Sequence, residues 1–217
     1  MKTIHIPFVE QPELLTYETM NDLLEKEGNQ GEIAHAQWNE FPYKPDVKFK
    51  IAYTRNYLWI KYNVKGLGLK AEYGKLNEPV FKDSCVEAFF ADHDGKGYRN
   101  IEVNCIGNLL SSHQEKKGVN KKSITGEEAA KIIRFSSVSS FDTFPEIEGI
   151  HEWSIILGVP FSLLGYKEIP ETIRGNFYKC ADDSKWPHFL SWSAIETEQP
   201  DFHRPEFFGT MVFDKKV

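Results

Sequence analysis

Apolar and polar residues alternate along several short segments of the chain, which is the pattern of β-strands with one buried face. Val47, Phe49 and Ile51 share one face of such a segment, with lysines between them. A second run begins after Arg55 and Asn56, and this spacing predicts a β-hairpin. Further β-branched and aromatic runs lie at 83–92, 98–112, 132–141, 151–160, 175–183, 189–195 and 209–214. Together the runs predict an all-β fold, an antiparallel β-sandwich with a few short helices.

Helical spacing of apolar residues is restricted to a few places. The segment 11–28 carries leucines and a methionine at this spacing, and Gly28 suits the end of a helix. The segments 126–132 and 160–166 each allow one or two helical turns. Between these elements, the polar and lysine-rich segment 113–125 predicts a solvated, mobile and partly disordered loop.

The composition favours one folded domain over residues 1–217. The chain is 41% hydrophobic and 14% aromatic, which is enough for a sizeable core. No Gly/Ser-rich or Pro-rich tract marks a domain boundary. We expect residues 1–44, which precede the first clear strand, to form an N-terminal extension that packs on the sandwich.

The charge pattern narrows the choice of partners. A formal net charge of −6 argues against nucleic acid or an anionic membrane as the main partner. No stretch approaches the 18 consecutive apolar residues of a membrane-spanning helix. The first apolar run is interrupted by His5 and Pro7, so it does not have the pattern of a signal peptide. We therefore expect a cytoplasmic protein, or a periplasmic or secreted one if a leader has been removed.

The three cysteines are Cys85, Cys105 and Cys180. Their odd number and wide spacing favour reduced, buried thiols over a disulfide framework. No two of them have the CxxC spacing that is typical of zinc sites. We therefore expect small core residues rather than a metal centre.

Two glutamates occupy strand faces that are otherwise mostly apolar. Glu87 shares its face with Phe89, and Glu102 shares its face with Asn104. If the two strands are neighbours, both carboxyl groups lie on one sheet face and form a polar floor. Such a pair could be the two carboxylates of a glycosidase, or it could hold a ligand without catalysis, and sequence spacing leaves both open. The chain has no nucleophile elbow, no Gly-rich phosphate loop and no HExxH motif.

Aromatic residues near predicted turns are a second signal. Phe81 and Phe202 lie beside turns and charged residues, whereas Trp192 lies in the middle of a predicted strand, where core packing is expected. An aromatic ring beside carboxylates and amides suits a sugar, whose C–H face stacks on the ring while its hydroxyls form hydrogen bonds. Core packing is the alternative for each ring.

An ordered set of motifs resembles carbohydrate-binding module family 9. The motifs are YLWIKYNVKG, FKDSCVEAFF, YRNIEVNCIGNLL, GNFYKCADD, LSWSAI and PDFHRPEFFGTMVF, which together span roughly residues 45–214. The sequence is most similar to bacterial proteins of that family that stand alone and often carry provisional glycoside hydrolase names. The resemblance implies a β-sandwich that binds a mono- or oligosaccharide without catalysis, by aromatic stacking plus polar contacts, in carbohydrate catabolism.

The resemblance also implies site residues. In that family two tryptophans clamp the sugar, and their positions match Phe81 and Phe202. The acidic ligand-holding residue matches Glu87, and the polar site residue of the next strand falls near Glu102, where an arginine of the family is replaced. A polar residue of the strand before SWS matches Lys179. Three further positions belong to motifs of the stand-alone subgroup: Asn104, His203 and Arg204.

Relatives in that family bind calcium, largely for structure. Asp83, Asp92 and Asp94 could supply oxygen ligands, although no calcium-loop spacing is present. We otherwise expect no cofactor and no metal.

The stretch QPDFHRPEFFG at 199–209 predicts a division at Pro205. We expect Phe202 and His203 to face the ligand, and Phe207 or Phe208 to pack inward. The leading hypothesis is a non-catalytic carbohydrate-binding protein. The alternatives are a glycoside hydrolase that uses Glu87 and Glu102, and an interaction scaffold whose sugar site has decayed.

Overall fold

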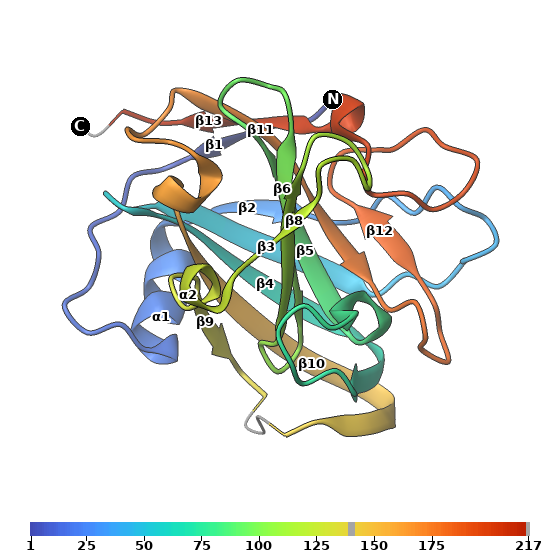
Figure 1. Ribbon diagram of the computed structural model, residues 1–217. Coiled ribbons are helices and arrows are strands. Elements are labelled where there is room, and N and C mark those ends of the chain that lie inside the picture. Colours follow the sequence, from blue (N-terminus) through green and yellow to red (C-terminus); the bar gives the residue numbers. More distant parts are fainter. Residues whose placement is uncertain (139–141, 216–217) are drawn as a thin grey trace.

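The protein is a sandwich of two β-sheets, seen in a computed structural model that describes residues 1–138 and 142–215. Figure 1 shows strands β5 and β6 of the first sheet in front of β3, β4 and β10 of the second. The first sheet has the order β1 (Thr3–Ile6), β13 (Gly209–Phe213), β11 (Thr172–Cys180), β5 (Cys85–Ala91), β6 (Tyr98–Asn104), β7 (Leu109–Gln114), β8 (Lys122–Ser123), with β12 (Phe189–Ser191) beside β11. The second has the order β2 (Asn29–Glu32), β3 (Asp46–Tyr53), β4 (Tyr57–Ala71), β10 (Phe144–Pro160), β9 (Ile133–Ser136).

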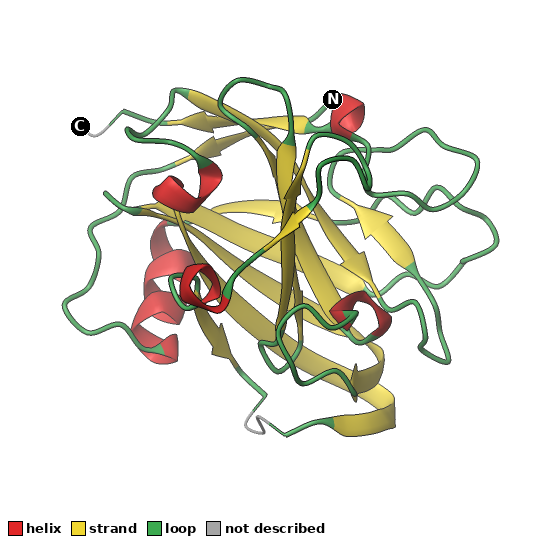
Figure 2. Cartoon of the chain, viewed as in Figure 1, coloured by secondary structure: helices red, strands yellow, loops and turns green. Residues whose placement is uncertain are grey.

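The helices of the described residues are short and peripheral (Figure 2). The α-helices are α1 (Tyr17–Glu27) and α2 (Gly126–Ala129), and the 3₁₀ helices are η1 (Val80–Lys82), η2 (Phe161–Leu164) and η3 (Pro205–Phe207). Nearly all strand pairs are antiparallel, so the predicted all-β antiparallel sandwich with a few short helices is confirmed. No helix in residues 1–138 and 142–215 is long and apolar enough to cross a membrane.

The main core lies between the two sheets. The alternation seen in the sequence decides which residues enter it, because Val47, Phe49 and Ile51 are all buried there. Phe49 of β3 and Phe177 of β11 meet across the gap, with ring centroids 4.6 Å apart. Trp192 also joins this core, as expected from its place in the sequence.

The outer face of the first sheet is covered as well, by loops and the 3₁₀ helix η1 rather than by an α-helix. Cys85 and Phe89 of β5 and Tyr178 of β11 point to this side and pack with Trp38, Val80, Ile195 and Phe202. The C-terminal loop that contains residues 192–208 can cover this face because it connects two strands on one edge of β11. β12 pairs with Tyr178–Cys180 and β13 with Thr172–Gly175. The loop between them therefore folds back over the sheet.

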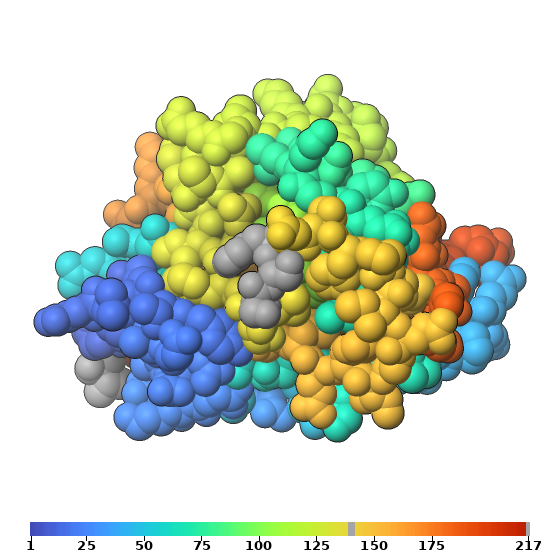
Figure 3. Space-filling view, turned by 90° about the horizontal axis from the view of Figure 1, so that it is seen from below, coloured from blue at the N-terminus to red at the C-terminus, as the bar shows by residue number. Residues whose placement is uncertain are grey.

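Helix α1 covers the outer face of the second sheet. Its Met20 and Leu24 are fully buried against Trp59 and Ile156. A capping box at Thr16 satisfies N–H groups of the first turn, and Gly28 closes the other end, as predicted. In Figure 3 this helix, in blue, lies beside the yellow-green segment around α2 and the gold strand β10.

The N-terminal residues contribute strands to both sheets. β1 pairs in parallel with β13, and β2 pairs with β3. The segment 1–44, which we expected to pack on the sandwich, therefore extends an edge of each sheet.

Most local predictions correspond to an element of the structure. The hairpin around Arg55 and Asn56 joins β3 to β4, and the two predicted helical turns are α2 and η2. The predicted run 132–141 contains β9, and its last three residues lie outside the described part of the chain. The segment 113–125 is more structured than a solvated loop, because β8 pairs with β7 and Ile124 is buried.

Candidate ligand-binding cleft

A cleft of about 260 Å³ opens on the outer face of the first sheet. Strands β5, β6, β7 and β11 form its floor, and its walls come from η1, β12, the β7–β8 segment and the C-terminal loop. The side chains that line it are Phe81, Glu87, Asn100, Glu102, Leu110, Lys117, Lys121, Cys180, Asp182, Phe189, Pro200, Asp201, Phe202 and His203. Five of the eight expected site residues are among them.

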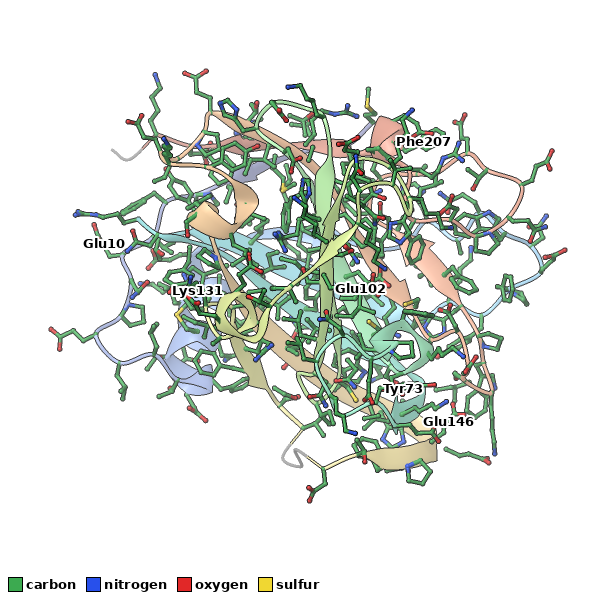
Figure 4. All side chains as sticks on the ribbon, viewed as in Figure 1. Glu10, Tyr73, Glu102, Lys131, Glu146 and Phe207 are labelled. Carbon is green, nitrogen blue, oxygen red and sulfur yellow. The ribbon has the colours of Figure 1, made fainter. Side chains whose placement is uncertain are left out.

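Glu87 and Glu102 form the acidic part of the floor. β5 and β6 are neighbours, and their register places the two glutamates directly opposite each other. Both point away from the inter-sheet core, and their residues are only 3% and 4% exposed. Figure 4 shows Glu102 near the middle of the front sheet. The expectation that two adjacent strands place both carboxyl groups on one face is therefore confirmed.

The Glu102 carboxyl group is oriented by one amide and otherwise free. Asn100 donates a hydrogen bond from Nδ2 to Glu102 Oε1 at 2.6 Å. The Asn100 amide is itself fixed, because its Oδ1 accepts hydrogen bonds from the backbone and hydroxyl of Ser112. Glu102 Oε2 is buried, with no hydrogen-bond partner in the described structure. A buried acceptor without a hydrogen bond is energetically costly. This oxygen is therefore suited to accept a hydrogen bond from a ligand.

The Glu87 carboxyl group contacts a thiol. Cys180 Sγ donates to Glu87 Oε1 at 3.1 Å and also lies 3.4 Å from the backbone carbonyl of Phe81. Burial raises the pKa of Glu87 well above its ordinary value, and repulsion from Glu102 raises it further. Glu87 therefore retains its proton to a higher pH than an exposed glutamate does.

Two other carboxyl groups of the cleft have shifted pKa values. Burial raises the pKa of Glu102 to about 7, against the hydrogen bond from Asn100, which lowers it. Burial also raises the pKa of Asp182 to about 6, with a contribution from the neighbouring Asp183. The floor therefore carries less negative charge at neutral pH than its carboxyl groups would suggest.

Three phenylalanines form the apolar walls. Phe81 lies on η1 and Phe189 on β12, and both are half-buried. Phe202 is only 8% exposed, because one face of its ring stacks on Tyr178 at a centroid distance of 4.2 Å. Phe202 lines the cleft as expected, but it presents less ring surface than Phe81 or Phe189.

His203 adds a neutral imidazole to the wall. Its Nδ1 lies 2.9 Å from the Tyr98 hydroxyl and 3.1 Å from Gln114 Nε2, and its ring packs on Phe89. Burial lowers the pKa of His203 to about 4, and the positive charge of Lys117 acts in the same direction. At neutral pH His203 is therefore a polar but uncharged side chain.

Arg204 supports the loop and does not line the cleft. Its Nε donates to Glu206 at 2.8 Å, and its guanidinium group also lies 3.9 Å from Asp201. On the other side of Pro205, Phe208 is completely buried and Phe207 is half-buried. The prediction that one of these two rings packs inward is confirmed.

Two expected site residues lie elsewhere. Asn104 is completely buried, and its side chain bonds to the Tyr73 carbonyl, to Asp83 and to the Asn108 backbone. Lys179 points to the opposite face of β11, where its Nζ donates to the backbone carbonyl of Cys180 at 2.6 Å. Because successive side chains of a strand alternate, Tyr178 and Cys180 face the cleft side and Lys179 cannot. Asn104 and Lys179 therefore do not line this cleft, although both were expected among the ligand-binding residues.

Several lining residues were not predicted from the sequence. Lys117 and Lys121 come from the segment that was expected to be a mobile loop, and Lys117 pairs with Asp201 at 2.9 Å. Asn100 is two residues before Glu102 in the same strand, so periodicity could have identified it. Phe189 and Asp182 follow β11, and their positions depend on how the chain folds back, which no local pattern reveals.

The three aspartates considered for calcium do not converge. Asp83 precedes β5, whereas Asp92 and Asp94 follow it, so they lie at opposite ends of the strand. The Asp83 carboxylate already accepts hydrogen bonds from the backbone of Glu72 and Tyr73 and from Asn104. The side chains that come closest to a metal-ligand set in the described residues are instead Cys85, Glu87 and Cys180. All three cysteines are free and buried, as predicted.

The cleft has the chemistry of a small polar-ligand site. It combines apolar rings, an unpaired acceptor, a neutral imidazole and two lysines at the rim. Apolar walls with a few placed polar groups are typical of sites for uncharged, hydroxyl-rich molecules.

Comparisons with known proteins agree with this fold. Residues 18–213 match the family model of carbohydrate-binding family 9. The crystal structure of a protein from Bacteroides uniformis ATCC 8492, provisionally described as carbohydrate-binding, is 32% identical. The alignment covers 98% of this chain and 99% of that chain, with a TM-score of 0.90. A comparison with curated proteins found no match.

Two complexes of a family 9 module from Caldicellulosiruptor kristjanssonii are similar in fold alone. The complex with glucose is 11% identical, with a TM-score of 0.62, and covers 100% of this chain and 97% of that chain. The complex with cellotriose is 12% identical, with a TM-score of 0.63, and covers 100% of this chain and 95% of that chain. The family match over most of the sequence, together with the Bacteroides structure, confirms the resemblance seen in the motifs. This chain belongs to carbohydrate-binding family 9.

Proposed function

We propose that the protein binds a mono- or oligosaccharide in the cleft above Glu87 and Glu102, without catalysis, as part of carbohydrate catabolism. The family and the ligands of its structural neighbours, glucose and cellotriose, support carbohydrate as the ligand class. The half-buried rings of Phe81 and Phe189 provide surfaces on which the C–H face of a sugar ring can stack.

The observation that carries the proposal is the unpaired Oε2 of Glu102. A sugar hydroxyl can donate to this buried oxygen and relieve its unsatisfied state. Asn100, Asp182 and His203 offer further hydrogen-bonding groups around the same space. This arrangement matches the needs of a hydroxyl-rich ligand better than those of a purely apolar one.

Hydrolysis is the second candidate, because the pKa of Glu102, about 7, suits a general acid. The placement of the two carboxyl groups argues against it. A glycosidase holds its carboxylates on either side of the scissile bond. Glu87 and Glu102 instead lie side by side on adjacent strands of the floor, so a ligand in the cleft would meet both from the same side.

Calorimetric titration with a panel of monosaccharides and β-linked oligosaccharides tests the proposal. We expect at least one sugar to bind at millimolar or lower concentration, and Glu102→Ala to weaken its binding. Phe207→Ala is the matched control, because Phe207 lies in the same loop but outside the cleft. Chromatography of the same mixtures after long incubation reports any hydrolysis.

Three results would contradict the proposal. One is that no sugar of the panel binds to the folded protein. Another is that Glu102→Ala and Phe207→Ala weaken binding equally, which would place the sugar elsewhere. The third is that the wild type releases product and Glu102→Gln does not, which would favour the hydrolase.

A further inference from the structure

Two cysteines and a glutamate form a compact cluster under the cleft. Cys85 and Cys180 are directly opposite each other in the β5–β11 pair, and Glu87 follows Cys85 on the same face of β5. The two thiol sulfurs and one Glu87 oxygen all lie within 4.8 Å of one another. Two strands, β5 and β11, thus bring together three potential metal ligands that are up to 95 residues apart in the sequence.

The spacing of these atoms is close to that of a zinc site. Zinc binds sulfur at about 2.3 Å and carboxylate oxygen at about 2.0–2.2 Å, in tetrahedral geometry. Ligand atoms of such a site are therefore roughly 3.3–3.8 Å apart. Cys180 Sγ and Glu87 Oε1 are 3.1 Å apart, so small rotations of the side chains would admit an ion. The strands themselves need not move.

The cluster is open on one side. Glu87 and Cys180 line the cleft, whereas Cys85 lies deeper and is completely buried. Three protein ligands with one free position are typical of zinc sites that bind water or a substrate. The neighbouring Glu102 Oε2, which has no partner in the described structure, could accept a hydrogen bond from a water in that fourth position.

The charge of the buried groups also bears on whether the cluster binds an ion. The cluster and Glu102 bring two thiols and two carboxyl groups together in a buried region, where negative charge is costly without a cation. Lys179 is buried and directly precedes Cys180 in the sequence. Its side chain lies on the other face of the strand, where its Nζ donates to the Cys180 backbone carbonyl. The protonated thiols and the protonated Glu87 carry no charge, and a divalent cation would stabilise the ionised forms that act as metal ligands.

We propose that Cys85, Glu87 and Cys180 bind a Zn²⁺ ion at the floor of the cleft, with the fourth coordination position open beside Glu102. The ion displaces the two thiol protons and the Glu87 proton, which are released to solvent as three metal–ligand bonds form. Thiolate ligands select zinc over calcium, which prefers oxygen ligands alone. The site is therefore distinct in chemistry from a structural calcium site.

Titration of the reduced, chelator-treated protein with Co²⁺ tests the site without a sugar. Cobalt replaces zinc in tetrahedral sites and gives a near-ultraviolet absorption band when thiolates bind it. We expect one equivalent of Co²⁺ to produce this band, and an equimolar amount of Zn²⁺ to remove it. Equilibrium dialysis against Zn²⁺ alone should give a stoichiometry of one ion per chain.

Alanine variants of the three cysteines provide matched controls. Loss of a supporting residue around a metal ligand already costs about 10–100-fold in affinity, so loss of a ligand should cost at least that much. Cys85→Ala and Cys180→Ala should therefore lose the band, whereas Cys105→Ala should keep it. Cys105 is equally buried, but it packs in the core between the sheets.

The wild-type titration decides the matter even if a variant fails to fold. The proposal is overturned if folded, reduced wild-type protein gives no thiolate-to-cobalt band. It is also overturned if Cys85→Ala, with an unchanged circular dichroism spectrum, binds Co²⁺ with the same band and affinity. Neither readout depends on sugar, so failure of the zinc site leaves the carbohydrate proposal to its own test.

Discussion

Glu87 and Glu102 face each other directly across strands β5 and β6, and both are almost completely buried. Two like charges at this position repel each other, and burial disfavours each charge separately. The pair therefore retains protons at a pH at which exposed glutamates are ionised. A ligand that donates hydrogen bonds, or a cation, would favour the ionised form.

The pair should make stability depend on pH between about 4.5 and about 7. The pKa of Glu102 is raised from 4.5 to about 7, so the folded state binds more protons than the unfolded state in this range. Stability from this group is greatest below pH 4.5 and is lost as the pH rises to about 7, by about 3 kcal/mol. Glu102→Gln should remove this contribution and leave the slope that comes from the raised pKa of Glu87. Urea denaturation of both proteins at several pH values measures it.

Gln is a suitable replacement because it keeps an acceptor for Asn100 and cannot ionise. Glu127→Gln is a matched control, since Glu127 is an exposed residue of α2 outside the cleft. If the wild type and Glu102→Gln have parallel profiles from pH 5 to pH 8, the raised pKa of Glu102 is wrong.

Phe81 and Phe202 should respond differently to truncation. Phe202→Ala removes a buried ring that stacks on Tyr178, and we expect a loss of about 3–5 kcal/mol in the free energy of unfolding. Phe81 is half-buried, so Phe81→Ala should cost about 1 kcal/mol but weaken sugar binding about tenfold. Thermal unfolding and calorimetric titration separate the two effects. Equal stability losses for both variants would contradict this assignment.

The alternation of side chains in strands explains why much of the site could be predicted. It predicted that Glu87 and Glu102 lie on one face, and this prediction required only that their two strands be neighbours in the sheet. Strands that follow one another in the sequence are often paired in the sheet. The same reasoning put Val47, Phe49 and Ile51 into the core.

The differences between the predicted site residues and the residues that line the cleft have physical reasons. Lys179 was assigned by a resemblance of motifs, and a displacement by one residue in a strand moves a side chain to the opposite face. Asn104 is on the expected side of β6, but its amide bonds to Asp83 and to turns at the end of the sheet. Lys117 and Phe189 enter the cleft through long-range folding, which local sequence does not encode.

Asn104 should therefore be a structural residue. Asn104→Ala would remove bonds to Tyr73, Asp83 and Asn108 and leave the Asp83 carboxylate less satisfied. We expect a loss of about 2 kcal/mol in the free energy of unfolding. Sugar affinity of the folded protein should change less than about twofold. If the Asn104→Ala variant were stable but no longer bound sugar, Asn104 would be a ligand-binding residue after all.

The ion pair between Lys117 and Asp201 joins two segments at the mouth of the cleft, the β7–β8 segment and the C-terminal loop. Lys117 is largely exposed, so the pair should add less than about 1 kcal/mol to stability. It nevertheless fixes the distance between two walls, and ordering them in advance of binding favours the bound state. We expect Lys117→Gln to weaken sugar binding several-fold at low salt, and less at high salt, with little change in thermal stability.

Lys96→Gln is the control for this last effect. Lys96 forms a comparable exposed ion pair with Asp94, in the turn between β5 and β6, and lines no part of the cleft. Its replacement should leave sugar affinity unchanged at every salt concentration. If Lys117→Gln behaves in the same way as Lys96→Gln in calorimetric titrations, the two walls do not need this ion pair. In that case the preformed rings and the Glu102 oxygen alone would account for binding.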